Sequence, residues 1–205
     1  GELEYENFNA ASAVFTITGV AVHPGSAKGI MENAALIASE IVEALPKTET
    51  PATTEGYEGF YHVESIAADG ANATLHCIVR DHDVEKFSVR KTFLDTVAKN
   101  VQAQHPTAKI EVEIKDSYYN MAQQIAPCMH LIDSAKTATE QAGAPVCIEA
   151  IRGGTDGARL SYMGLPCPNL GTGGYNFHGP YECIAAEDMD TAVKIIKNIV
   201  TLYAQ

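Results

Sequence analysis

Apolar positions along the chain change their spacing from one segment to the next, and these changes predict its elements. Residues 1–8 alternate polar and apolar side chains, which is typical of a half-buried strand. A β-rich run from Val14 to Val22 follows and ends at the turn signal His23-Pro24-Gly25. Because the sequence opens inside an alternating run, with no preceding cap or loop, we expect the chain to be part of a longer protein.

A helical spacing comes next, bounded by residues that start and stop helices. Ser26 stands where an N-cap would for a helix from about Lys28 to Leu45, and Pro46 ends it. Apolar residues three or four positions apart predict that one face of this helix is buried. They are Ile30, Ala34, Ile37, Ile41 and Leu45.

The middle of the chain predicts a β-hairpin. Two alternating runs, Phe60–Ala67 and Ala71–Asp81, flank the dipeptide Asp69-Gly70. An Asp-Gly turn between alternating runs is a strong hairpin signal, because both residues tolerate the backbone conformation that a tight turn requires.

A second helix and a last strand complete this part of the chain. The helix extends from about Val84 to Gln104 and ends at His105-Pro106, and the strand covers Ile110–Tyr118. Residues 14–118 therefore have the order β-α-β-β-α-β, which predicts the split βαβ or ferredoxin-like arrangement.

After Tyr118 the order of elements changes to a β/α succession. This succession is typical of a layered αβα domain, although it has too few strands to close a sheet alone. We predict an α/β (α+β) protein with one domain at 14–118 and a partial second domain formed by 1–13 and 119–205. The elements predicted after Tyr118 are a helix from about Pro127 to Ala142, a strand at Pro145–Ile151, a short helix from about Asp156 to Met163, a strand at Asn169-Leu170 and a helix at Glu187–Tyr203.

Charge and hydropathy narrow the range of partners. The chain has 14 Lys and Arg against 26 Asp and Glu, a formal net charge of −12. Nucleic-acid binding requires a basic face, so this balance argues against such a partner. No apolar run approaches the roughly 20 residues that span a bilayer, and no basic-then-apolar leader precedes the first strand. We therefore expect a soluble protein with no membrane partner.

The cysteines predict a reducing compartment. There are five, an odd number, without CxxC spacing and mostly within apolar runs: Cys77, Cys128, Cys147, Cys167 and Cys183. We interpret them as buried free thiols rather than disulfides or metal ligands. A cytoplasmic location follows from the unpaired cysteines and the missing leader.

The densest chemistry lies in two Gly-rich turns, residues 152–157 and 171–174, and the loop that follows the second. His178 lies in that loop between Phe177 and Gly179. It is either a metal ligand or general base, or an ordinary surface histidine. Glu182, four residues on, is either a second ligand or an acid at the start of a helix. One histidine does not make a metal site.

Arg152 ends an apolar run immediately before Gly153-Gly154. Its planar fork of donors suits a carboxylate, and a structural salt bridge is the alternative. Thr155 and Asp156 are interpreted as caps of the following helix. The turn lacks the Lys-Ser/Thr of a P-loop, and no Gly-x-Ser-x-Gly elbow of serine hydrolases occurs in the chain.

Two further residues lie at ends of predicted strands. His23 occupies an exposed tip and, taken alone, carries no functional signal. Arg80 has Asp81, His82 and Asp83 beside it, and a solvated charge cluster is the default interpretation.

Longer stretches of the sequence resemble the peptidase T family of tripeptide aminopeptidases, which belongs to a clan of zinc-dependent metallopeptidases. The resemblance extends over essentially all 205 residues. It is carried by GELEYENFNAAS, VHPGSAKG, TEGYEGFYHVES, DSYYNM and IRGGTDGARLSYMGLPCPNLGTGGYNFHGPYE. The long final motif is much more specific than either Gly-rich turn alone.

The resemblance implies a homodimeric enzyme that removes the N-terminal residue of tripeptides with two zinc ions and uses a βαββαβ insert as its lid and dimerisation domain. His178 would be a zinc ligand, and Arg152 would hold the carboxylate end of the substrate. His23 and Arg80 on the lid would contact substrate, with His23 reaching the site of the partner subunit. Asn176 is a further candidate for substrate contact.

The family's other zinc ligands and its general base would lie upstream of Gly1. The 205 residues are therefore expected to be the C-terminal portion of the enzyme, inactive and a poor binder of zinc by themselves. The alternative is a non-catalytic dimerisation or binding module that has kept the lid.

Overall fold

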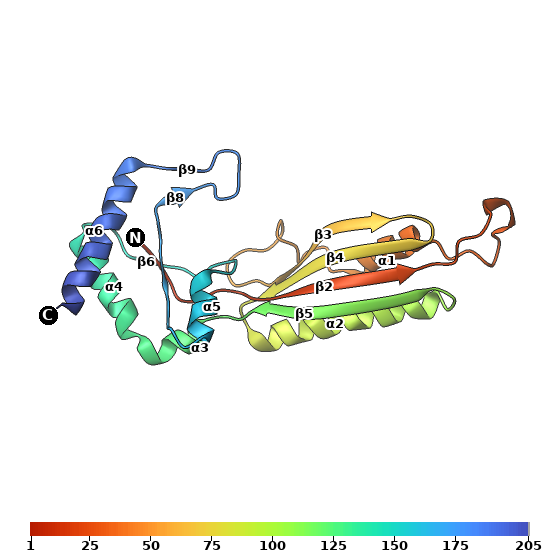
Figure 1. Cartoon of the computed structure of the whole chain (residues 1–205), viewed down its shortest axis with the longest axis horizontal. Coiled ribbons are helices and arrows are strands. Elements are labelled where there is room, and N and C mark those ends of the chain that lie inside the picture. The colour runs from red at the N-terminus through yellow and green to blue at the C-terminus, as the bar shows by residue number, and fades with distance from the viewer. Residues whose placement is uncertain (205) are drawn as a thin grey trace. The chain divides into compact units, whose positions relative to one another are not determined.

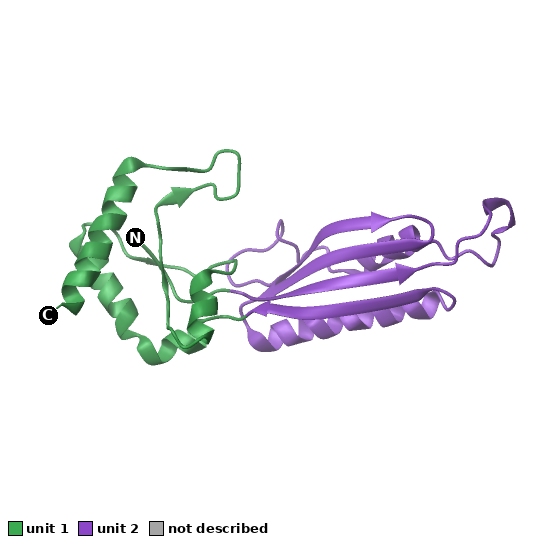
Figure 2. Ribbon diagram, viewed as in Figure 1, with its two compact units in different colours: residues 1–7, 119–205 green, residues 8–118 purple. Residues whose placement is uncertain are grey.

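The computed structural model describes residues 1–204, a mixed α/β chain that divides into two compact units. The central unit is Phe8–Tyr118, and the terminal unit combines Gly1–Asn7 with the chain from Tyr119 onward (Figure 2). The central unit begins at Phe8, one residue before the first long strand, whereas the sequence pattern placed the boundary at residue 14.

The central unit is one antiparallel sheet with two helices on a single face (Figure 1). The strand order is β3-β4-β2-β5 and the chain order is β-α-β-β-α-β, which is the ferredoxin-like arrangement expected from the sequence. The elements are β2 (Asn9–Thr18), α1 (Ala34–Ala44), β3 (Phe60–Ala68), β4 (Asn72–Asp81), α2 (Val84–Gln104) and β5 (Lys109–Tyr118).

Alternation along β2 builds the core of this unit. Ala11, Ala13, Phe15 and Ile17 are almost completely buried, and the alternate residues from Ser12 to Thr18 are partly or fully exposed. They pack with the apolar faces of both helices, and each large side chain buried in this way contributes about 1.5–3 kcal/mol. The helix side chains in this cluster include Ile37, Ile41, Phe87, Leu94 and Val101.

The predicted hairpin is confirmed. The Asp69 carboxylate accepts backbone hydrogen bonds from Ala71 (2.7 Å) and Asn72 (2.8 Å), which closes the turn between β3 and β4. These two bonds also hold the pKa of Asp69 below its usual value. The register then places Phe60 opposite Arg80, with an irregularity after Val63.

The predicted start of the first helix is wrong. Helix α1 starts at Ala34, and the Asn33 side chain caps it by accepting hydrogen bonds from the Ala35 and Leu36 amides. Ser26 instead lies in a 3-10 turn, η1 (Pro24–Ser26), and Ile30 is 56% exposed. Gly29 adopts φ +75°, and Val20 pairs with Glu32 across the base of the segment, so residues 19–33 form a loop rather than a helix.

The terminal unit contains small sheets and four α-helices within the described residues. Strand β1 (Glu2–Glu4) lies between β6 (Cys147–Ile148), to which it is parallel, and β7 (Asn169–Leu170), to which it is antiparallel. A hairpin pairs β8 (Gly174–Tyr175) with β9 (Cys183–Ile184). The helices are α3 (Ala122–Ile125), α4 (His130–Gln141), α5 (Asp156–Tyr162) and α6 (Ala186–Tyr203), with a 3-10 turn η2 at Ala126–Cys128.

Two predictions for this unit were too long. The expected strand at 145–151 reduces to β6 and one bridge between Ile151 and Asn7. The expected helix from Pro127 begins only at His130, because the proline lies in the 3-10 turn. Buried Asn7 links distant parts of the unit, since its side chain donates to the Tyr119 carbonyl (3.1 Å) and accepts from the Met121 amide (2.8 Å).

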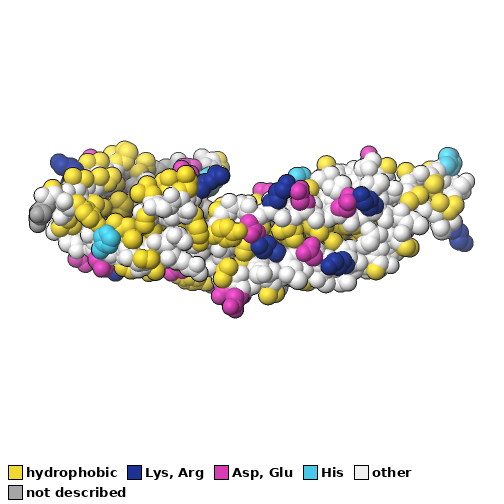
Figure 3. Space-filling model, turned by 60° about the horizontal axis from the view of Figure 1, so that its bottom comes forward, with side chains coloured by type: hydrophobic (Ala, Val, Ile, Leu, Met, Phe, Trp, Pro, Cys, Tyr) yellow, Lys and Arg dark blue, Asp and Glu magenta, His cyan; other side chains and the backbone are white. Residues whose placement is uncertain are grey.

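The core of the terminal unit is small, and its surface is rich in apolar side chains. Its buried cluster consists of Met121, Ile125, Ile132 and Ala158. Hydrophobic side chains cover much of the visible face of the unit that contains α6 (Figure 3). On α6 itself Met189, Val193, Ile196, Val200 and Tyr203 are all about half exposed or more.

The cysteines only partly match the prediction. All five are free, but only Cys77 is buried, and Cys183 is exposed. Burial raises the pKa of the Cys77 thiol to about 12, so this side chain is a neutral core residue. None of the helices within residues 1–204 has the length and apolar character needed to cross a membrane.

Candidate functional site

Arg152 lies where the chain leaves a short parallel pairing in the terminal unit. The Ile151 amide donates to the Glu6 carbonyl (2.9 Å), and Ile151 pairs with Asn7, so the next residue stands at the end of an extended segment. The Arg152 side chain is partly buried. This position at a strand end, followed by two glycines, is the one that the sequence predicted for a carboxylate-binding arginine.

The first Gly-rich turn is fixed by a cap and a close approach. The Thr155 hydroxyl accepts a hydrogen bond from the Ala158 amide (3.2 Å), which confirms the predicted cap of α5. A Cβ added to Gly157 would lie 2.3 Å from the Cys167 carbonyl oxygen and 2.6 Å from the Asn169 side-chain oxygen. Only glycine fits at residue 157 without a shift of the backbone.

The loop between β8 and β9 carries two of the predicted site residues, Asn176 and His178. Both adopt positive φ angles, +57° and +63°. The Asn176 side chain donates to the Tyr181 carbonyl (3.3 Å), and the Gly179 amide donates to the Asn176 carbonyl (3.0 Å). The loop is therefore a tight turn with its own hydrogen bonds, and it brings these two predicted residues together.

His178 presents an unpaired imidazole to solvent. Its backbone amide donates to the Glu182 carboxylate (2.9 Å), but within residues 1–204 its ring nitrogens have no protein partner. An exposed imidazole of this kind could serve as one ligand of a metal ion. No group of three or more His, Cys, Asp or Glu side chains in the described part of the chain is placed to hold a metal ion.

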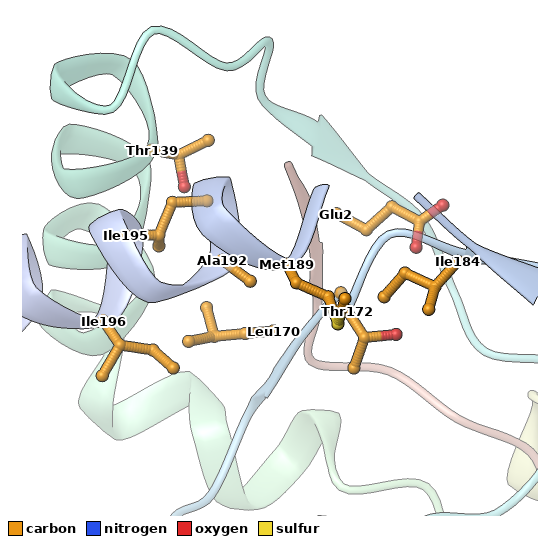
Figure 4. A pocket seen from close by; sticks show the side chains of 10 residues that line it. Glu2, Thr139, Leu170, Thr172, Ile184, Met189, Ala192, Ile195 and Ile196 are labelled. Atoms are coloured by element: carbon orange, nitrogen blue, oxygen red, sulfur yellow. The ribbon is translucent and has the colours of Figure 1, made fainter. Parts of the chain in front are cut away.

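An apolar pocket of about 320 Å³ lies elsewhere in the terminal unit (Figure 4). Side chains of Leu170, Ile184, Met189, Ala192 and Ile195 point toward it, with Glu2 and Thr139 at its border. None of the predicted site residues lines this pocket. It has the character of an incompletely covered core and not of a catalytic centre.

His23 is an exposed side chain in the loop of the central unit that joins β2 to α1. Its Nδ1 accepts a hydrogen bond from the Gly25 amide (3.1 Å), which makes it the cap of η1. Since Nδ1 accepts this bond, Nε2 is the ring nitrogen that can donate. His23 can therefore donate to a ligand while its other nitrogen fixes the orientation of the ring.

Arg80 lies on β4, and its environment corrects the prediction of a solvated charge cluster. Its guanidinium carbon is 5.9 Å from the centre of the Phe60 ring, and the side chain is partly buried. Its neighbours Asp81 and His82 are 1% and 7% exposed. Burial raises the pKa of Tyr118, and the Arg80 charge partly opposes this rise. Arg80 therefore lies in a packed aromatic region.

A second arginine in this region was not predicted from the sequence. The Arg90 Nε donates to the Asp81 carboxylate (2.8 Å), and another guanidinium nitrogen donates to Glu49. These residues border a polar cavity of about 650 Å³ within the central unit. Glu49 and Arg90 are 41 residues apart, and no local pattern could have paired them.

The predicted site residues thus fall into two sets, one on each unit. Arg152, Asn176 and His178 belong to the terminal unit, and His23 and Arg80 belong to the central unit. Of these five residues, only Asn176 and His178 lie in the same loop.

Comparison with known proteins identifies relatives over the whole chain. A peptidase T of Fusobacterium nucleatum is 50% identical over 205 residues, which is 100% of this chain and 50% of that protein. The chain spans about half the length of the curated relatives that it matches.

Solved structures share the fold. Aminopeptidase PepT from Bacillus cereus superposes with a TM-score of 0.82 at 18% sequence identity. The match covers 100% of this chain and 54% of the PepT chain. A tripeptidase from Staphylococcus aureus superposes with a TM-score of 0.80 at 16% sequence identity. The match covers 98% of this chain and 53% of the tripeptidase chain. The family model described as peptidase dimerisation domain matches residues 5–109, a range that covers β2, β3, β4 and both helices of the central unit and ends at the first residue of β5. The chain belongs to the peptidase dimerisation domain family.

Proposed function

We propose that the longer protein to which this chain belongs is a zinc-dependent aminopeptidase that releases the N-terminal residue of tripeptides. The observation that carries the proposal is the 50% identity to a peptidase T across all 205 residues, because it extends through both units and not only the dimerisation domain. This chain would be its C-terminal portion. Peptide hydrolysis is the reaction, with water as the second substrate.

His178 would supply one ligand of a site with two zinc ions, and the remaining ligands and the general base would come from residues outside this chain. Bound zinc polarises the scissile carbonyl and lowers the pKa of a water molecule. His178 would bind through its unpaired imidazole as the neutral base. The carboxylate next to it, Glu182, is hydrogen-bonded to the backbone of the same loop.

Arg152 would bind the C-terminal carboxylate of the tripeptide and so fix the distance to the scissile bond. A guanidinium offers two parallel donors to a carboxylate, and such charge-assisted pairs are stronger than neutral hydrogen bonds. Asn176, in the same loop as His178, would contact the peptide backbone. Arg80 and His23 would contact substrate from the lid, with His23 reaching the site of a partner subunit.

The experiment is hydrolysis by the longer protein loaded with zinc. We expect cleavage of tripeptides with a free amino end, no cleavage after N-acetylation, and loss of activity with a chelator. Arg152→Ala should raise KM about 10- to 100-fold for a tripeptide with a free carboxylate and change KM little for its C-terminal amide. Absence of tripeptide cleavage by the zinc-loaded protein would refute the proposal.

The isolated 205-residue chain should behave differently from the longer protein. We expect no hydrolysis and negligible zinc retention after dialysis, because one imidazole does not hold the ion. Inductively coupled plasma mass spectrometry of the dialysed chain measures this directly, and two tightly bound zinc ions per chain would contradict it.

Dimerisation would occur through the central unit, which also matches the family's dimerisation domain. Sedimentation should show a dimer of the chain, and a monomer at high concentration would count against it.

The alternative function, a non-catalytic dimerisation or binding module, is motivated by the same match. It predicts dimers without any peptidase activity of the longer protein. We also propose a cytoplasmic location, which the unpaired cysteines support.

A further inference from the structure

The loop between β8 and β9 holds two non-glycine residues in a backbone conformation that L-residues rarely adopt. Asn176 has φ +57° and His178 has φ +63°. Asparagine and histidine tolerate this region better than most residues, but it persists only where the surrounding contacts fix it. For His178 the fixing contact must be local, because the residue is exposed.

Glu182 supplies this contact. One of its carboxylate oxygens accepts the His178 amide proton at 2.9 Å. Its own backbone amide donates to the Gly179 carbonyl at 3.2 Å, so Glu182 is bonded on both sides of the peptide link between His178 and Gly179. A hydrogen bond with a charged acceptor is stronger than one between neutral groups.

Two simpler roles for Glu182 do not fit the structure. It is not an acid at the start of a helix, because α6 begins at Ala186, after β9. It is also not a partner of the imidazole, whose ring nitrogens are unpaired within the described chain. Its contact is with the backbone that sets the direction of the His178 side chain.

We propose that Glu182 is a positioning residue for His178: its carboxylate holds the His178 backbone in the left-handed conformation and so presents the imidazole in one orientation. The proposal rests on the proposed role of His178 as a metal ligand. Glu182 then acts on the ligand, and not on the metal. A side chain that orients a ligand typically changes metal affinity about 10- to 100-fold when it is removed.

The test compares three variants of the longer protein. Glu182→Ala removes the acceptor, Glu182→Gln keeps an uncharged oxygen at the same position, and Glu140→Ala removes an exposed carboxylate of α4 that has no partner in the described structure. Hydrogen exchange of the His178 amide is measured without zinc, and zinc affinity is measured by chelator competition. Circular dichroism melting verifies that each variant is folded.

We expect Glu182→Ala to accelerate exchange of the His178 amide several-fold and to weaken zinc binding about tenfold or more. Glu182→Gln should restore both in part, and Glu140→Ala should change neither. Unchanged exchange in Glu182→Ala, or faster exchange with unchanged zinc affinity, would overturn the positioning role.

His178→Ala separates this proposal from the function on which it rests. If His178→Ala leaves zinc affinity unchanged, the ligand assignment itself is wrong, and the positioning role falls with it. If His178→Ala abolishes one zinc site while Glu182→Ala does not alter affinity, the function stands and only the positioning role is refuted.

Discussion

Arg90 shows how one side chain can determine the stability of the region around it. It donates to Asp81, whose side chain is only 2% exposed, and to Glu49, and its guanidinium lies 5.2 Å from the centre of the Tyr61 ring. Burial lowers the pKa of Arg90, but its hydrogen bonds to Asp81 and Glu49 outweigh burial and raise it. Arg90 therefore keeps its positive charge next to the nearly buried Asp81 carboxylate.

Arg90→Ala should destabilise the central unit by about 3–5 kcal/mol, because it leaves a buried carboxylate without its cation. Urea unfolding followed by circular dichroism measures this change. Lys47→Ala is the control: it breaks an exposed ion pair with Glu43 and should cost less than about 1 kcal/mol. Equal losses in the two variants would show that the Asp81 charge is compensated in another way.

Gly157 matters for stability for a different reason, because a side chain at this position has no room. An alanine there would place its Cβ 2.3 Å from the Cys167 carbonyl oxygen, and backbone cannot yield as a flexible side chain does. Gly157→Ala should destabilise the terminal unit by about 1–3 kcal/mol. Gly153→Ala is the matched control in the same turn, since its nearest contact would be an ordinary 3.8 Å. The same unfolding experiment compares them, and a neutral Gly157→Ala would contradict the close approach.

Three segments of the central unit meet at His105, directly after α2. Its Nδ1 lies 2.5 Å from a carboxylate oxygen of Glu32, at the base of the loop 19–33, and its Nε2 lies 2.7 Å from Glu40 on α1. Both ring nitrogens can donate only in the imidazolium form. Burial lowers the pKa of His105, but the hydrogen bonds and charges of Glu40 and Glu32 outweigh it, so the pKa is raised above 6.5.

A raised pKa gives this contact a defined pH dependence. The stabilisation is fully present below the unfolded value of about 6.5 and is lost as the pH rises through the higher folded pKa. His105→Gln should therefore be less stable than the wild type at about pH 6, and the difference should shrink by about pH 9. Urea midpoints across this range test it, with His76→Gln, an exposed strand residue, as the control. Parallel curves for wild type and His105→Gln would disprove the contact.

Elements with local signals were predictable from the sequence, and elements fixed by distant contacts were not. Helix α2 and the hairpin at Asp69 were predicted closely, because their caps and turn residues lie within the segments themselves. Helix α1 was predicted to begin too early, because the pairing of Val20 with Glu32 makes a loop of residues that have helical spacing. In the candidate site, the Gly-rich loops indicated His178 as a candidate. The role of Glu182 could not be predicted, because it depends on a hydrogen bond that only the structure shows.

At the scale of the whole chain, the two units differ in how much apolar surface they bury. The central unit has a continuous core between its sheet and two helices. The buried cluster of the terminal unit consists of Met121, Ile125, Ile132 and Ala158, and large side chains of α6 remain exposed. Since burial of apolar surface is the main favourable term in folding, the terminal unit should be the less stable of the two.

We therefore expect the 205-residue chain to unfold in two steps, with the terminal unit first. Hydrogen exchange with mass spectrometry at increasing urea should show α4 and α6 losing protection before β2 and β4, because opening the smaller core costs less free energy. Gly157→Ala should shift only the first step, and Arg90→Ala only the second, since each residue packs within one unit. A single transition shared by both units, shifted by either variant, would mean that they fold as one cooperative body.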